Sequence, residues 1–283
     1  MIPEEFEYQR AATLDEAISL IQASNGDGKF LAGGHSLIPL MKLRLSEPGT
    51  LIDISRIPQL KGITEQNGKV QVGAASTHTE VLQSELIRRV CPVVSECAAE
   101  IADPQVRNRG TMGGSLAHAD PSADYPAVMV ALDAEIHLKG PGGWRAVKAG
   151  DFFQGMFTVD MAEDEIIAGI QLPPAQHAAY VKLHQRASHY AIVGVAAVLE
   201  MNGRTCTSAR IGITGASTHA QRLANVEAAL AGKELTQANI DAAAAIADAN
   251  LEDVNSDLHA SEAYRRAMVK VFTRRAIERA ASR

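Results

Sequence analysis

The chain has 283 residues, of which 46% are hydrophobic and 21% are charged, and its formal net charge is -6 at pH 7. This composition is typical of a globular protein that can bury a cofactor, and the length favours two or three domains over a single core. The acidic balance provides no basic excess to neutralise a phosphate backbone, so it argues against nucleic-acid binding.

Membrane insertion and metal binding are also disfavoured. No apolar run approaches the roughly 18 residues of a membrane span, and the N-terminus lacks the segments of a signal peptide. We therefore expect a cytoplasmic protein without a membrane span.

The three cysteines, Cys91, Cys97 and Cys206, lack CxxC spacing. They indicate buried thiols rather than disulfides, a zinc site or the four ligands of an iron–sulfur cluster, so we expect no metal in this chain.

The first 57 residues predict a small α/β unit. Thr13 is placed to cap the first helix, and Glu16, three residues later, is the partner that a capping box requires. Apolar periodicity and turn residues predict alternating strands and helices. The expected strands cover 6–11, 29–31 and 51–54, and the expected helices cover 14–24 and the run that begins at 37.

A second region is expected over 58–176. Asn67-Gly68 is a strong hairpin signal, and Pro173-Pro174 marks the end of the region. The pattern predicts a helix over 78–101 that is interrupted at Pro92, a helix over 126–132, a hairpin around 140–143 and a strand over 165–173.

The last region, 177–283, reads as a sheet followed by helices, which is an α+β arrangement. Three strand-like segments, two of them joined at Asn202-Gly203, predict a three-stranded antiparallel sheet. Helices are expected over 225–231, 237–251 and 261–281.

Two glycine pairs, Gly33-Gly34 and Gly113-Gly114, lie beside small polar residues. Glycine lets the backbone approach a ligand, where N–H groups and hydroxyls donate to phosphate oxygens. One pair alone fits an ordinary turn, whereas two pairs in separate regions suit a dinucleotide diphosphate that lies between them. A larger side chain at Gly33 or Gly114 is then expected to fill the site of close approach.

Neither glycine pair matches the G-x-G-x-x-G fingerprint, a P-loop or a nucleophile elbow, which disfavours NAD in a doubly wound sheet and ATP hydrolysis. The cluster of His118, Asp120 and Asp124 could be read as metal ligands, but a Pro-containing loop of this kind more often caps the next helix. Asp124 is better interpreted as an acceptor for a ligand over the second glycine pair. Lys182 fits a solvated charged face, or a donor to an anionic cofactor. Tyr190 could cover an aromatic ring.

The segments "AGGHSLIPLMKLRL", "RGTMGGSLAHADPSADYPAVMVALDA" and "YVKLHQRASHYAIVGVAA" resemble the FAD-binding medium subunit of the molybdenum hydroxylases, the carbon monoxide dehydrogenase and xanthine dehydrogenase family. The resemblance runs essentially end to end. It implies an α+β fold, with an FAD-binding fold of the vanillyl-alcohol oxidase (PCMH) type in two subdomains, 1–57 and 58–176, and a flavoprotein C-terminal domain over 177–283.

The resemblance also implies which residues contact FAD. They are Ala32, Gly33, Gly34, His35, Ser36 and Leu37 in the first loop, Thr111, Met112, Gly113, Gly114 and Ser115 in the second, and Asp124, Ile167, Lys182 and Tyr190 elsewhere. Family members often have Asp where this chain has His189, so a polar contact to the flavin from that position is in doubt.

The function that the resemblance implies is electron transfer. A large partner subunit would hold molybdopterin, and a small one would pass electrons through two [2Fe–2S] clusters to the FAD of this chain, in a dimer of heterotrimers. No residue here need be a catalytic acid or base. Two alternatives stay open. One is a free-standing flavin oxidase or dehydrogenase with His118 as its base, and the other is a non-catalytic nucleotide-binding module. The hydroxylated substrate is set in another chain, and the final electron acceptor, whether quinone, cytochrome, NAD or oxygen, stays open.

Overall fold

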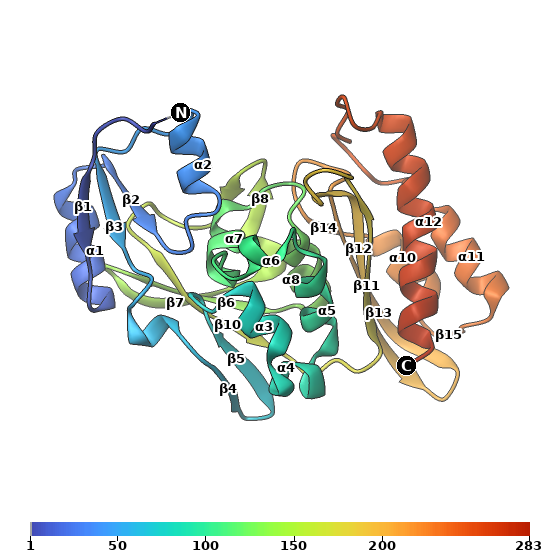
Figure 1. Ribbon diagram of the computed structural model, residues 1–283. Helices are drawn as coiled ribbons and strands as arrows, with labels where there is room; N and C mark the ends of the chain where they lie inside the picture. Colours follow the sequence, from blue (N-terminus) through green and yellow to red (C-terminus); the bar gives the residue numbers. More distant parts are fainter. Residues whose placement is uncertain (1) are drawn as a thin grey trace.

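The N-terminal region is a parallel sheet flanked by helices (Figure 1). The computed structural model describes residues 2–283. Strands β1 (Glu7–Arg10) and β2 (Gly28–Leu31) both pair in parallel with β3 (Thr50–Asp53), which gives the order β1-β3-β2. Helix α1 (Leu14–Ala23) connects β1 to β2, and α2 (Leu37–Lys42) connects β2 to β3. These elements confirm the expected α/β unit.

The start of α1 shows how local sequence sets this unit. The Thr13 hydroxyl accepts a hydrogen bond from the Glu16 N–H at 3.1 Å, as a cap should. The Glu16 carboxylate, however, accepts from the N–H of Ala12 at 2.7 Å rather than from that of Thr13. Only half of the predicted capping box is therefore formed as expected.

The middle region is built on a five-stranded antiparallel sheet in the order β4-β5-β10-β6-β7. Asn67 and Gly68 have φ values of 53° and 73°, the left-handed pair that a tight hairpin needs, so the predicted turn between β4 and β5 is confirmed. The strands are β4 (Ile63–Gln66), β5 (Lys69–Gly73), β6 (Glu135–Gly140), β7 (Gly143–Lys148) and β10 (Ile166–Leu172), with a separate hairpin of β8 (Phe153–Gly155) and β9 (Thr158–Val159).

Helices cover this sheet. The interruption predicted at Pro92 is confirmed, since α4 ends at Val90 and α5 begins at Pro92. The stretch before it is not one helix, because Ser84 ends α3 and its hydroxyl caps α4 by accepting from the Ile87 N–H. The helical elements of the region are η1 (Pro58–Leu60), α3 (His78–Gln83), α4 (Glu85–Val90), α5 (Pro92–Glu100), α6 (Pro104–Arg107), α7 (Met112–His118), α8 (Asp124–Leu132) and α9 (Ala149–Phe152).

The C-terminal region is an antiparallel sheet backed by three helices. The three predicted strands are present. Two further strands of two residues each join the sheet, so the sheet has five strands rather than the expected three. The strands are β11 (Ala178–His184), β12 (Ala191–Asn202), β13 (Thr205–Thr214), β14 (Gln221–Arg222) and β15 (Lys233–Glu234). The helices are α10 (Ala224–Leu230), α11 (Gln237–Ala245) and α12 (Glu262–Ala281).

Helix α11 ends at Ala245 rather than at the predicted residue 251. Its alanine-rich sequence favours a longer helix, but the side chain of Arg266 on α12 donates to the carbonyl oxygens of Asp248 and Leu251 at 3.0 and 3.1 Å. These carbonyls are thereby satisfied outside a helix, so tertiary contact overrides the local preference.

The C-terminal sheet has a hydrophobic core on each face. Val195 and Ala197 of β12 pack in the core formed with α10, α11 and α12, whereas Ala196 and Val198 pack in the core that contains α8. Alternating side chains of one strand therefore join the last region to the middle one. Figure 1 shows α8 on the side of the sheet opposite α12.

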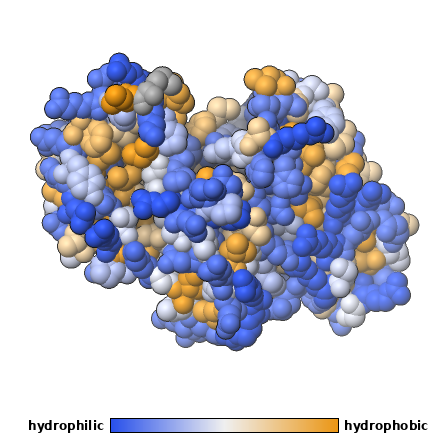
Figure 2. Space-filling view, viewed as in Figure 1, coloured by the Kyte–Doolittle hydropathy of each residue, from blue (hydrophilic) through white to orange (hydrophobic). Residues whose placement is uncertain are grey.

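The surface is mainly hydrophilic. Figure 2 shows a notch at the upper edge of the molecule between the N-terminal part and the C-terminal part. Across residues 2–283, none of the helices has the length and apolar character that crossing a bilayer requires.

Candidate functional site

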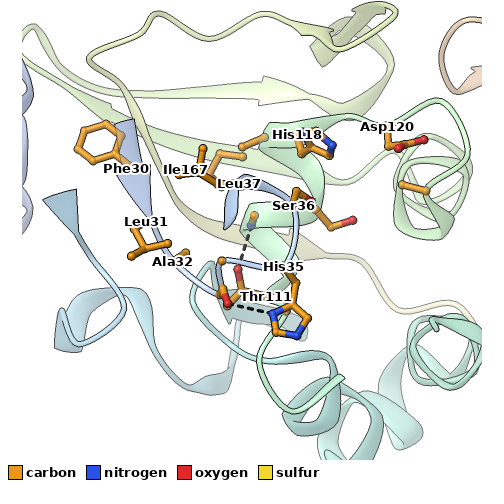
Figure 3. A pocket seen from close by; sticks show the side chains of 18 of the residues that line it. Phe30, Leu31, Ala32, His35, Ser36, Leu37, Thr111, His118, Asp120 and Ile167 are labelled. Atoms are coloured by element: carbon orange, nitrogen blue, oxygen red, sulfur yellow. Dashed lines mark hydrogen bonds between the residues drawn. The ribbon is translucent and has the colours of Figure 1, made fainter. Parts of the chain in front are cut away.

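A cavity of about 990 Å³ collects most of the residues singled out in the sequence. Figure 3 shows the walls from the loop after β2, α7 and strand β10. The segment before β12 adds a further wall. Of the fifteen predicted contact residues, thirteen line this cavity. Met112 and Lys182 do not.

The loop after β2 presents backbone donors without a hydrogen-bond partner in the described part of the chain. The amide N–H groups of Gly33, Gly34, His35, Ser36 and Leu37 donate to no group within residues 2–283. The hydroxyl of Ser36 does not cap α2 either. Such successive free amides form a concavity that favours an anion. This loop therefore has the donor set that a diphosphate requires.

Two different demands explain the glycines of this loop. Gly34 has a φ of 74°, a conformation that residues with a Cβ rarely adopt. Gly33 faces the backbone of the 109–110 segment, where an added Cβ would clash with the carbonyl oxygen of Arg109 and lie 2.9 Å from the Cα of Gly110. The expected reason for glycine at position 33, close approach of a ligand, is therefore replaced by close approach of another part of the chain.

The second glycine loop differs, because its amides are already bonded. Met112 and Gly113 donate to the carbonyl oxygens of Ser76 and Ala74 at 3.0 and 2.8 Å. The Gly114 amide donates to the capping hydroxyl of Thr111 at 3.1 Å, which Figure 3 marks. The expectation that these N–H groups donate to a phosphate is not met in this conformation. What remains for a phosphate on this wall are the hydroxyl of Ser115 and the O–H of Thr111, which accepts from Gly114 but donates to no group within residues 2–283.

Met112 and Lys182 lie away from the cavity for physical reasons. The Met112 side chain is fully buried in the hydrophobic core. The Lys182 ammonium group is also buried, and it donates to the Glu100 carbonyl oxygen at 2.7 Å and to Asp124. Neither the solvated face nor the direct cofactor contact expected for Lys182 matches this position.

Asp124 connects the cavity wall to the C-terminal sheet. Its carboxylate accepts from the Tyr180 hydroxyl at 2.6 Å and lies 2.8 Å from the Lys182 ammonium nitrogen. Burial raises the pKa of Asp124 to about 6, and the hydrogen bonds from Lys182 and Tyr180 oppose that rise. Both oxygens of Asp124 therefore have partners inside the protein, so it supports the cavity wall by an ion pair between regions.

His118, Asp120 and Asp124 do not converge on a point. Asp124 bonds to Lys182 and Tyr180, whereas Asp120 accepts from the Ser122 N–H at 2.8 Å and turns the loop before α8. Within residues 2–283, no three His, Cys, Asp or Glu side chains are grouped as metal ligands. The loop leads into α8, but the side-chain cap suggested by the sequence is not formed, because the N-cap residue is Ala123.

Aromatic side chains surround one part of the cavity. Tyr190 is 45% exposed and Phe157 is 53% exposed. The Phe157 ring lies 5.1 Å from the imidazole of His118. A turn that bonds the Gln185 N–H to the Tyr190 carbonyl oxygen at 2.8 Å holds Tyr190 in place, with His189 in a left-handed conformation of φ 62°. Planar rings at these positions can pack against an aromatic ligand.

Several lining residues escaped sequence analysis. Phe30 and Leu31 end strand β2, and their place just before the glycine pair could have signalled them. Phe157 lies in the turn between β8 and β9, and His78 begins α3, and neither position has a recognisable motif.

Comparison with known proteins identifies this arrangement. Residues 4–175 match the model of the FAD binding domain in molybdopterin dehydrogenase, and residues 178–280 match that of the CO dehydrogenase flavoprotein C-terminal domain. The chain belongs to the FAD-binding subunits of the molybdopterin dehydrogenases. The two matches divide the chain close to the boundary expected at the Pro173-Pro174 pair.

Relatives of known name support the family assignment over the whole length. The chain is 39% identical to the carbon monoxide dehydrogenase medium chain of Hydrogenophaga pseudoflava, covering 100% of this chain and 99% of that one. A solved structure of carbon monoxide dehydrogenase from that organism superposes with a TM-score of 0.96 at 40% identity, covering 100% and 99% of the two chains. The glyceraldehyde dehydrogenase medium chain of Sulfolobus acidocaldarius is 35% identical, covering 99% and 100%.

The family makes FAD the cofactor and this chain a subunit of an oxidoreductase complex. The cavity fits that cofactor. Its volume of about 990 Å³ lies at the upper end for ligand sites. The free amides from Gly33 to Leu37 suit the diphosphate, and the exposed rings of Tyr190 and Phe157 suit the flavin ring.

Proposed function

We propose that this chain is the electron-transfer subunit of a molybdenum hydroxylase. It receives electrons from the [2Fe–2S] clusters of a small partner subunit and passes them through FAD to an external acceptor. A large partner subunit holds molybdopterin and the substrate. We further propose that the complex is a dimer of heterotrimers in the cytoplasm.

The observation that carries the proposal is the whole-length match to medium chains of dehydrogenases with different named substrates, carbon monoxide and glyceraldehyde. A subunit shared by enzymes that act on such different molecules supports a task common to all of them. When bound, FAD supplies the redox chemistry, accepting electrons and releasing them. The residues of this chain bind the diphosphate, orient the ring and shield it from water.

The fifteen residues that the resemblance implies as FAD contacts divide into two groups under this proposal. The thirteen that line the cavity contact the cofactor directly. Met112 and Lys182 do not contact the cofactor but support the residues that line the cavity. Met112 does so by packing in the core, and Lys182 by its ion pair with Asp124.

A second candidate, a free-standing flavin oxidase or dehydrogenase, has one observation in its favour. His118 lines the cavity, and burial lowers the pKa of its imidazole, so the ring is neutral near pH 7 and able to accept a proton. Electron transfer is favoured because this chain aligns over its whole length with relatives that are named medium chains. A medium chain is one subunit of a larger enzyme, which argues against a free-standing oxidase.

The experiment that tests the proposal uses the native complex. An affinity tag on this chain should copurify two further subunits together with molybdenum, iron and FAD. After removal of FAD, the substrate should still bleach the iron–sulfur absorption, while reduction of an external dye should stop. Full dye reduction without flavin would overturn the proposal. Oxidation of a small substrate by the isolated chain would favour the oxidase, and a chain that binds nucleotide without any flavin would favour the non-catalytic module.

A further inference from the structure

His78 is a cavity residue that the sequence motifs do not single out. It is the first residue of α3, and its backbone N–H donates to the carbonyl oxygen of Gly110 at 3.0 Å. Its side chain lines the cavity, although the residue is only 5% exposed. A Cβ added to Gly110 would lie 2.6 Å from His78 Nε2, so the imidazole packs directly on the segment that also contacts Gly33. His78 thus lies between the two glycine loops.

Neither ring nitrogen of His78 has a hydrogen-bond partner among residues 2–283. Nδ1 is buried without any hydrogen bond. Nε2 also lacks a hydrogen bond, but unlike Nδ1 it is not among the fully buried atoms. It is therefore the ring nitrogen that a ligand in the cavity can reach. Buried polar atoms are nearly always bonded in folded proteins. A ligand atom in the cavity is the natural partner for Nε2.

The protonation of the ring follows from its surroundings. Burial, reinforced by the neighbouring His35 and Arg107, lowers the pKa of His78 to about 4, so the imidazole is neutral near pH 7. A neutral imidazole carries one N–H. A buried donor without a partner is rarer than a buried acceptor without one, which places the lone pair on Nδ1 and the proton on Nε2. Nε2 is therefore a donor directed to the cavity.

The charge of the cavity shows why such a neutral donor matters. Among the described lining residues there are one lysine, Lys29, no arginine, and four acidic residues, Asp120, Asp124, Glu163 and Glu165. Lys29 lies 3.7 Å from the Glu163 carboxylate, which balances its charge. A diphosphate at this site is therefore stabilised mainly by neutral N–H and O–H donors, as in other backbone anion sites.

We propose that His78 is a further FAD-binding residue whose Nε2–H donates to a diphosphate oxygen between the two glycine loops. The inference rests on FAD as the ligand of this cavity and adds a side chain that the loop motifs do not contain. His78 is a binding residue and takes no part in electron transfer.

Three variants test it by the position of their donors. His78→Gln carries an amide nitrogen at about the distance of Nε2, His78→Asn carries one at about that of Nδ1, and His78→Leu carries none. Affinities of the flavin-free complex for FAD, ADP and riboflavin are measured by flavin fluorescence and by competition. Thermal unfolding of each flavin-free variant checks that the fold is intact.

We expect His78→Leu and His78→Asn to weaken FAD and ADP binding by about 10- to 100-fold, the loss of one hydrogen bond to a charged group. His78→Gln should restore most of the affinity, and riboflavin, which lacks phosphate, should bind all forms alike. Unchanged FAD affinity in His78→Leu, or an equal loss for riboflavin, would overturn the inference and leave His78 a packing residue. A wild-type complex that binds no FAD would instead overturn the assignment of the cofactor.

Discussion

The two glycine loops look alike in the sequence and differ in the structure. From Gly33 to Leu37, five consecutive amides are free to face a ligand. From Met112 to Ser115, every amide already donates to a carbonyl or hydroxyl oxygen of the protein. A glycine pair therefore does not by itself show that backbone donors are available. The partner of each N–H group decides which loop can bind an anion.

The comparison extends to the rest of the cavity wall. Asp124 also lines the cavity, and its oxygens are likewise occupied, by Lys182 and Tyr180. One wall is thus prepared for a ligand, while the other is held together by bonds within the protein. Substitutions on the second wall should act first on stability, and substitutions on the first should act on binding.

The largest effect is expected for Lys182→Met. This change leaves the buried Asp124 carboxylate with Tyr180 as its only side-chain donor, and removing one partner of a buried ion pair costs about 3–5 kcal/mol. Urea denaturation measures the free energy of unfolding. Lys270→Met is the matched control, because Lys270 also lies 3.0 Å from a carboxylate, that of Asp248, but its side chain is 42% exposed. Equal losses for both variants would contradict the importance of burial.

Asp124→Asn should reveal a pH dependence. Folding raises the pKa of Asp124 from 3.8 to about 6. The folded state then binds the proton more tightly, so stability falls as pH rises from about 4 to 6 and is constant above that range. The stability of wild type relative to Asp124→Asn should decrease by about 3 kcal/mol over this range. Unfolding curves of both proteins, measured between about pH 3.5 and about pH 7, check the slope. A constant difference would show that the carboxyl does not titrate there.

Much of this architecture could be predicted from local sequence. Asn67-Gly68 specifies its hairpin and Thr13 specifies a helix start, because both act within a few residues. The glycine loops were found because small residues follow a strand or precede a helix. Each of these features depends on near neighbours in the chain.

The rest depends on contacts between distant segments. The Gly113 amide donates to the carbonyl oxygen of Ala74, and Lys182 forms an ion pair with Asp124. The periodicity of the sequence predicts neither contact. His78 has no motif because its role depends on Gly110, which packs against its ring. The break at Ser84 is not evident from the pattern, because serine, although favoured at N-caps, also occurs inside helices and the apolar periodicity continues past it.

Alanine at Gly33 and at Gly114 should separate the two walls further. At position 33 the new Cβ would meet the Arg109 carbonyl oxygen, and such overpacking costs about 1–3 kcal/mol and should also weaken FAD binding by disturbing the free amides. At position 114 it would meet only the Thr111 hydroxyl, at 2.8 Å. Gly142→Ala, with no atom within 4 Å, is the control. Thermal unfolding and FAD titration measure both effects, and a larger loss of stability for Gly114→Ala would refute the comparison.

The smallest change in stability is expected for Ser36→Ala. The Ser36 hydroxyl caps no helix, so its loss should leave the flavin-free protein as stable as wild type while weakening FAD binding by about 10-fold. Thr111→Val provides the contrast, because the Thr111 hydroxyl accepts from the Gly114 amide and its loss should cost about 1 kcal/mol of stability. Measuring the free energy of unfolding and the FAD affinity of both variants distinguishes a loss of binding from a loss of stability. If Ser36→Ala lowered stability as much as Thr111→Val, the Ser36 hydroxyl would be bonded within the protein, as the Thr111 hydroxyl is, and would not be free to donate to an anion.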